Sequence, residues 1–167
     1  MFRAKFSYKA TVTKLRQVAV IMLNATPQLL QVVGVGALGL IRSDFEVKSR
    51  GGTGVDGTTW KDVTEETKER KRKKGRGSST AHQINVDRGL LRNSSQPGFS
   101  HAEGGNIFDQ SNTEDEASVT VGFGMEYAGY VDEVRELIPD PWPDVWLAEL
   151  NEITEEAIDT ILAEGLK

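Results

Sequence analysis

The part of the sequence that most constrains the fold is an uncharged stretch over residues 17–41. Its apolar residues recur at three- and four-residue spacings, which is the pattern of a helix with one buried face. Thr26 and Pro27 stand within the stretch and are typical of a helix N-cap and first turn. We therefore expect two helices in a hairpin, the first carrying residues 12–23 and the second running from Pro27 to about Phe45.

The same stretch has to be weighed as a membrane-spanning helix, because about 20 apolar residues cross a bilayer. Polar residues stand near its middle, where a bilayer disfavours them most: Gln17, Asn24, Thr26, Gln28 and Gln31. The sequence thus favours a hairpin that is buried or packed against a neighbouring copy, without membrane contact. Because residues 1–6 interleave charged and apolar side chains, no signal peptide is expected.

Three glycines of this stretch, Gly34, Gly36 and Gly39, match the dinucleotide-binding pattern G-x-G-x-x-G. Such a site needs a preceding strand, a following crossover helix and an acidic residue about 20 positions further on. Residues 40–45 alone separate the pattern from a polar, glycine-rich loop, which leaves no room for that helix. We therefore predict that the glycines let helices or subunits approach closely, and we expect no cofactor.

Composition excludes several kinds of chemistry. The chain has no cysteine, and its two histidines are His82 and His101. These counts exclude disulfides, cysteine-ligated zinc, a thiol nucleophile and a zinc ion held by three histidines. No carboxylate pair, nucleophile motif or phosphate-binding loop stands at a diagnostic spacing. We expect neither an enzyme active site nor a metal site.

Charge is divided unevenly along the chain. Residues 1–84 carry 16 basic and 7 acidic side chains, and residues 85–167 carry 4 and 18, giving net charges of +9 and −14. Either the two halves neutralise each other within one monomer, or they offer complementary surfaces to copies that meet head to tail and close into a ring.

The remaining patterns predict one α+β domain over residues 1–167. Apolar and polar residues alternate over residues 2–8 and again over residues 118–123, which predicts two strands. A short helix is expected to begin at Thr64, and Asp144 is expected to cap a final helix. Polar, glycine-rich stretches predict flexible loops near residues 48–59, 74–83 and 94–116. We expect a small, mainly antiparallel sheet with two N-terminal helices and a C-terminal helix.

Several short motifs also follow one another along the chain. They are Phe45, Gly54-Val55-Asp56-Gly57-Thr58-Thr59-Trp60, residues 64–67 with Lys71, residues 87–94, Val121-Gly122 and Tyr127-Ala128. In this order they resemble the phage virion-morphogenesis family, which includes Mu-type tail-completion and neck proteins of long-tailed phages. The resemblance covers about residues 26–165. Two places depart from the family pattern: residues 130–133 replace its histidine and glycine, and residues 140–142 lack its arginine.

The resemblance implies a structural virion protein, commonly six copies of which form a ring at the neck. Such a ring binds connector, stopper or tail-terminator rings, lets phage DNA pass without sequence-specific contact, and is assembled in the host cytoplasm. Trp60 would anchor its loop in its own core, which we favour, or in the adjacent subunit. Asp87 and Arg92 would order the turn at Gly89 or pair across the interface. The interface candidates are Asp56, Gly57, Trp60, Lys71, Arg72, Lys73, Asp87, Arg92, Trp142, Glu152 and Glu156.

An alternative function comes from residues 68–76, where seven of nine side chains are basic. Such a segment can contact phosphates without reading sequence, as in a non-specific nucleic-acid-associated accessory protein. It can equally be a solvated helix end that pairs with an acidic surface of another chain.

Overall fold

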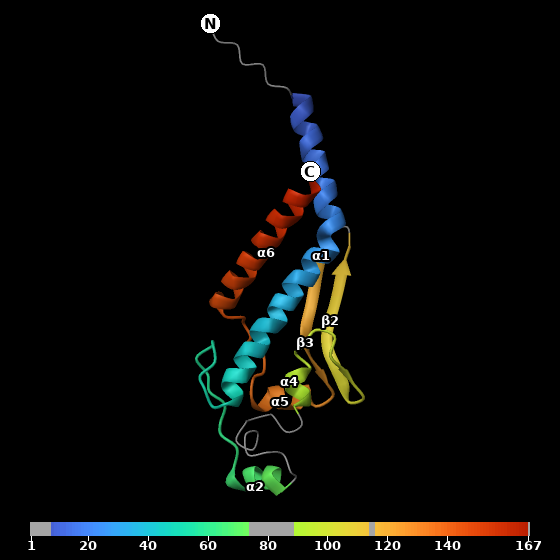
Figure 1. Cartoon of the computed structure of the whole chain (residues 1–167). Coiled ribbons are helices and arrows are strands. Elements are labelled where there is room, and N and C mark those ends of the chain that lie inside the picture. The colour runs from blue at the N-terminus through green and yellow to red at the C-terminus, as the bar shows by residue number, and fades with distance from the viewer. Residues whose placement is uncertain (1–7, 74–88, 114–115, 167) are drawn as a thin grey trace.

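The computed structural model describes residues 8–73, 89–113 and 116–166 and confirms the α+β class (Figure 1). The helices are α1 (Tyr8–Ser49), α2 (Glu65–Lys73), α4 (Leu90–Asn93), α5 (Ala128–Val134) and α6 (Asp144–Gly165). The strands are β1 (Ser100–His101), β2 (Gly104–Asn112) and β3 (Ala117–Met125), which form an antiparallel sheet in that order. The expected C-terminal helix, the helix after Thr64 and the strand at 118–123 are confirmed.

The expected hairpin of two N-terminal helices is wrong, because α1 runs unbroken from Tyr8 to Ser49 with Pro27 inside it. Proline in a helix interior removes one backbone hydrogen bond, here to the carbonyl of Leu23. Pro27 and Leu23 are both exposed, so water can reach that carbonyl. The hydroxyl of Thr26 donates to the carbonyl of Met22 at 3.0 Å instead of capping a new helix. Residues 1–7 of the expected first strand lie outside the described residues, and Tyr8 begins α1.

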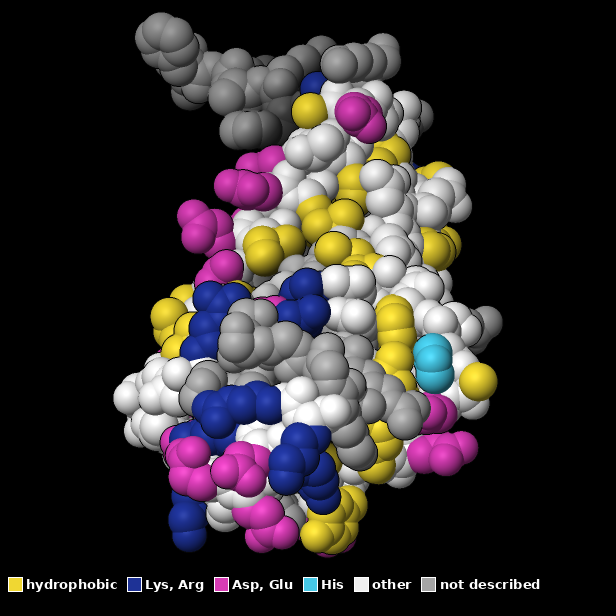
Figure 2. Space-filling view, turned by 60° about the horizontal axis from the view of Figure 1, so that its bottom comes forward, with side chains coloured by type: hydrophobic (Ala, Val, Ile, Leu, Met, Phe, Trp, Pro, Cys, Tyr) yellow, Lys and Arg dark blue, Asp and Glu magenta, His cyan; other side chains and the backbone are white. Residues whose placement is uncertain are grey.

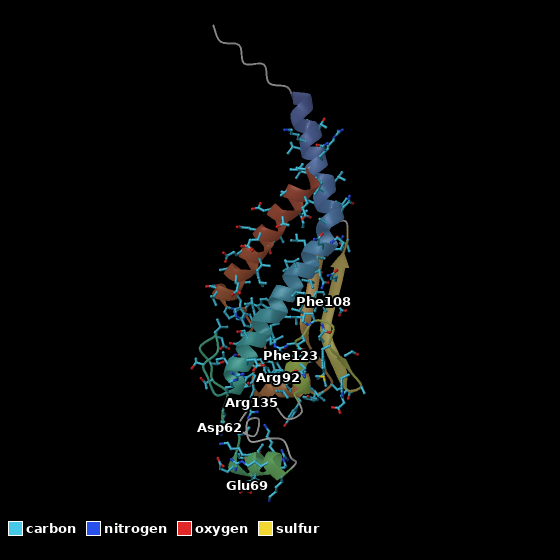
Figure 3. The ribbon with its side chains drawn as sticks, viewed as in Figure 1. Asp62, Glu69, Arg92, Phe108, Phe123 and Arg135 are labelled. Carbon is cyan, nitrogen blue, oxygen red and sulfur yellow. The ribbon has the colours of Figure 1, made fainter. Side chains whose placement is uncertain are left out.

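Strands β2 and β3 form a hairpin that lies along α1. Their register pairs Phe108 with Val121 and Asn106 with Phe123, so these four side chains share one face. This face meets the helix, and Gln110 donates to Gln31 of α1 at 3.1 Å. Figure 3 shows Phe108 and Phe123 on this hairpin beside α1. The expectation of a flexible loop over residues 94–116 is therefore wrong for β1 and β2, whose backbone groups find partners across the sheet.

Helix α6 packs along α1 on the side away from the hairpin (Figure 1). The glycine pattern of α1 serves these two contacts, as the sequence predicts. A Cβ atom at Gly34 would lie 2.7 Å from Cζ of Phe108, and one at Gly36 would lie 3.0 Å from Cδ1 of Ile153 on α6. Gly39 has nothing within 4 Å of its Cβ position. The first two glycines therefore let the hairpin and α6 approach the helix closely.

The hydrophobic core lies at the C-terminal end of α1, where α4, α5, β3 and the start of α6 meet it. Phe45 is completely buried and packs edge-to-face on Trp60 at a centroid distance of 5.2 Å and against Phe123 at 5.6 Å. The cluster comprises Ile41, Phe45, Trp60, Leu91, Phe123, Met125, Ala128, Leu137 and Trp146. The N-terminal half of α1 takes no part in it.

Among the described residues, one helix is long and apolar enough to span a membrane by length and composition. It is the part of α1 from Val12 to Ser49, whose most apolar window has a mean hydropathy of 1.6. Only 6% of that window is buried. This window is thus not the covered core helix that such composition often marks in a globular protein, although the C-terminal end of α1 is buried.

Candidate functional site

Residues 50–60 leave α1 and fold back onto its last two turns, and we call them the clasped loop. The ammonium of Lys48 holds the loop, with Nζ 2.9 Å from Oδ2 of Asp44 on the same helix and 2.7 Å from Oδ2 of Asp56 on the loop. The backbone N–H of Val55 donates to Oδ1 of Asp44 at 2.7 Å. Asp44 therefore holds both Lys48 and the loop backbone. The expectation of a flexible loop over residues 48–59 is wrong at its first two residues, which belong to α1, and the rest is tied to the helix.

Lys48 is completely buried, which is costly for an ammonium group unless carboxylates compensate it. Burial by itself would lower the pKa of Lys48, but the hydrogen bonds and charges of Asp56 and Asp44 outweigh it and raise the pKa above its usual value. Burial would raise the pKa of Asp56, yet hydrogen bonds from Lys48 and Thr58 hold it below its usual value. Lys48 and Asp56 are therefore both charged near neutral pH.

The loop turns on two glycines, one of them packed too closely for a side chain and the other in a left-handed backbone conformation. A Cβ atom at Gly54 would collide with Cε of Lys48 and would lie 2.7 Å from Oδ1 of Asp44. Gly57 has a φ of 79°, a left-handed conformation that favours glycine. Its N–H donates to the carbonyl of Gly54 at 3.0 Å, and Thr58 donates from N and Oγ1 to Asp56. The Asp-Gly pair of the motif thus forms a tight turn whose aspartate points back to the helix.

Trp60 ends the clasped loop in the core of its own chain, which is the alternative that the sequence favours. It is 5% exposed, and its Nε1 donates to the carbonyl of Glu136 at 3.3 Å. The tryptophan therefore joins the loop to the segment before α6, 76 residues later in the chain.

Arg92 lies near the clasp but belongs to a second, weaker set of charges. Its Nε is 3.6 Å from Oε1 of Glu46, whose other oxygen accepts from Arg50 at 3.2 Å. Gly89, with a φ of 78°, begins the turn before Arg92. Asp87 lies outside the described residues, so its pairing with Arg92 stays a prediction.

The basic segment on α2 is partly neutralised within the chain. Nζ of Lys68 is 2.9 Å from Asp62 and 2.8 Å from Glu65, and hydrogen bonds to these carboxylates raise the pKa of Lys68. Lys71 is buried, whereas Arg72 and Lys73 are exposed. Figure 2 shows Lys and Arg side chains at the end of the molecule where α2 lies, with Asp and Glu side chains beside them. Residues 74–76, with the predicted loop at 74–83, lie outside the described residues.

The remaining candidates lie on or before α6. Trp142 is half-buried and packs edge-to-face on Trp146 at 5.6 Å. Glu152 and Glu156 are exposed on α6. The structure therefore brings Asp56, Gly57 and Trp60 together in the clasped loop but does not join them to the basic or acidic candidates.

Sequence reasoning missed Asp44, Glu46 and Lys48, the helix residues that organise this region. The available signal was the i,i+4 spacing of Asp44 and Lys48 immediately after the uncharged stretch, a spacing at which helical side chains meet. Chemically, a protonated ammonium between two carboxylates is a poor base and nucleophile, but its charge-assisted hydrogen bonds hold the groups together strongly. Among the described residues, no group of three His, Asp or Glu side chains could hold a metal ion. The clasp is suited to presenting a loop in a fixed shape.

No protein-family model, curated protein or solved structure matches the chain significantly.

Proposed function

We propose that the protein is a structural component of a phage virion that forms an oligomeric ring at the neck, completes the tail and joins it to the head. One observation carries this proposal: four apolar residues from the motifs of the resemblance, which are scattered along the sequence, meet in one core. Phe45, Trp60, Leu91 and Ala128 all belong to the same buried cluster. A motif set that specifies one fold is expected to place its apolar residues in one core, as these four are placed.

The charge distribution supports assembly of several copies. Lys48 and Lys68 pair with carboxylates of their own half of the sequence, so these contacts do not use the acids of α6. The exposed face of α6 carries Glu149, Glu152, Glu155, Glu156 and Asp159. In the proposed ring this face meets a neighbouring subunit or an adjoining connector, stopper or terminator ring, and DNA passes through the lumen.

The experiment is deletion and complementation in the phage that encodes the chain. We expect deletion to leave filled heads and separate tails, and expression of the chain from a plasmid to restore joined particles, as counted by electron microscopy. A tagged chain should be found at the neck of those particles. Normal joining without the chain would refute the proposal.

The alternative of a nucleic-acid-associated accessory protein rests on the exposed Arg72 and Lys73 of α2. It predicts that the logarithm of the DNA-binding constant falls linearly with the logarithm of the salt concentration. Changing Lys71, Arg72 and Lys73 to alanine should then reduce that slope by about 0.9 for each phosphate that the segment no longer binds. Absence of binding at low salt would exclude this alternative.

A further inference from the structure

Strand β2 has a free edge over most of its length. Strand β1 pairs with Gly104 and Gly105, where β2 begins, and the N–H of Asn106 donates to the carbonyl of Phe99 at 3.1 Å. Beyond Asn106 no described residue pairs with β2 on that side. Helix α1 lies beside β3, so this is the edge of the hairpin away from the helix (Figure 1). We call residues 107–112 of β2 the free edge.

The backbone of the free edge is arranged to bond an added strand. Backbone groups point to alternate sides along a strand, so the N–H and C=O groups of Phe108, Gln110 and Asn112 point the same way as those of Asn106. The strand contains no proline, no lysine and no bulge, which are devices by which proteins commonly block such an edge. The free edge therefore offers a row of donors and acceptors to an extended peptide.

An added strand would meet two different faces of the hairpin. On the face toward α1, Phe108 packs at Gly34. On the opposite face, Ile107, Asp109 and Ser111 are exposed. Residues 104–125 carry four acidic side chains and no basic one. The best complement is thus an alternating segment with apolar side chains on the face toward α1 and basic side chains on the face that carries Asp109.

Residues 2–7, which lie outside the described residues, have this composition. Their sequence is Phe-Arg-Ala-Lys-Phe-Ser, and residues 1–16 carry five basic side chains and no acidic one. The other alternating stretch, residues 118–123, already belongs to β3, and the other basic segment begins as the helix α2. Aromatic pairs and pairs of opposite charge across neighbouring strands both stabilise a sheet. Within this chain, residues 2–7 are therefore the segment that complements the free edge.

The free edge lies out of reach of residues 2–7 of the same chain. Gln110 contacts Gln31, which stands 23 residues after Tyr8 on α1. At about 1.5 Å per residue, this part of the helix is about 35 Å long. Residues 2–7 leave the helix at Tyr8 and extend at most about 20 Å. If residues 2–7 bind this edge, they must therefore come from a second copy.

We propose that residues 2–7 of one copy bind as an added strand along the free edge of β2 in the next copy. The contact joins two different surfaces, so it is head-to-tail and can close into a ring. Arg3 and Lys5 would lie on the face that carries Asp109. This inference deepens the proposed function by naming a contact between copies, and it rests on that function for the premise that copies assemble.

A backbone substitution on the free edge tests the contact in the full-length chain. Gln110→Pro removes an N–H that points toward the added strand and none that bonds β3, and proline is tolerated on edge strands. Gln110→Ala is the matched control, because it also loses the side-chain hydrogen bond to Gln31 but keeps the N–H. In sedimentation equilibrium, Q110P should weaken self-association about tenfold, and Q110A by no more than about twofold. Circular dichroism checks that both variants keep their fold.

A second pair of variants leaves the hairpin unchanged. R3E/K5E reverses two charges of the segment that is proposed to bind. Its matched control, K14E/R16E, makes the same change in net charge at two exposed positions of α1. Because R3E/K5E turns attraction to the acidic hairpin into repulsion, it should weaken self-association about tenfold, and its control should weaken it less.

Photocrosslinking identifies what lies on the free edge. Phe6 is replaced by the photoreactive residue p-benzoylphenylalanine in the full-length chain. Isotopically labelled and unlabelled copies are mixed, so that mass spectrometry separates crosslinks between copies from crosslinks within one. We expect crosslinks between copies that fall on residues 107–112.

Each outcome decides the inference. Weaker association of Q110P and R3E/K5E than of their controls, together with crosslinks between copies at the free edge, supports it. A chain that stays monomeric overturns it, and particle assembly still tests the function. If the chain associates but both variants match their controls, or the crosslinks fall elsewhere, the contact lies on another surface; the inference is then wrong and the ring remains proposed. If Q110P does not fold, R3E/K5E and the crosslinks decide in the same way.

Discussion

Replacing Lys48 by methionine is the sharpest test of the clasp. The side chain of Lys48 is fully buried, and its two partners are nearly so, with 3% exposure for Asp44 and 12% for Asp56. Methionine fills a similar volume but leaves two carboxylates without their cation. Breaking a buried pair in this way costs about 3–5 kcal/mol, because the orphaned charge has lost its water as well as its partner.

Urea unfolding followed by tryptophan fluorescence measures this loss, because Trp60 lies at the end of the clasped loop. The variant D44N/K48M/D56N removes all three charges, and each asparagine can still accept the backbone hydrogen bonds from Val55 and Thr58. This triple variant should regain at least half of the free energy of unfolding that K48M loses. The matched control is Arg50→Ala, which removes an exposed pair with Glu46 and should cost at most about 1 kcal/mol. A K48M loss no larger than the control's would refute the reasoning.

Three further predictions concern the same fold. The unfolding midpoint in urea should be flat from about pH 5 to 10. It should fall below about pH 4, since protonation of Asp56, whose pKa is lowered in the folded state, removes its stabilisation. It should fall again above about pH 10, since Lys48, whose pKa is raised, stabilises the fold only while charged; K48M should lack this alkaline fall. Gly54→Ala should cost about 1–3 kcal/mol in the same assay, because the new methyl group collides with Lys48, and an unchanged midpoint would contradict this close packing. Gly39→Ala should raise stability by about 0.5–1 kcal/mol through helix propensity. Gly34→Ala should show no such gain, because Phe108 occupies the space, and equal gains at both sites would contradict the close approach.

Local sequence patterns predicted those helices and strands for which the periodicity and the flanking residues indicate the same structure. The final helix exists as expected, but Asp144 is the first residue of α6 and Pro143 stands at its N-cap. Ile161 of the expected apolar face is buried, whereas Val145 and Leu147 are exposed. Strand β3 follows the alternation at residues 118–123. In each case one periodic pattern and its flanking residues point to the same structure, so no distant contact was needed to decide it.

Strand β2 shows where such reasoning fails. Its residues include Gly104, Gly105, Asp109 and Asn112, which have low strand propensity and by themselves predict a loop. The strand forms because β3 supplies hydrogen-bond partners along its whole length and because Phe108 packs against α1 at Gly34. Neither partner is visible in a local window of sequence.

The sequence by itself determined the helical periodicity of residues 12–45, the final helix, the α+β class and the exclusion of cysteine chemistry. Tertiary structure alone decided that α1 continues through Pro27 and that Lys48 is buried between Asp44 and Asp56. The physical reason is the range of the interactions. Periodicity and composition are properties of neighbouring residues, whereas the continuity of α1 depends on packing against α6 and the hairpin. A buried charge, likewise, is tolerated only when the folded chain brings its partners within 3 Å.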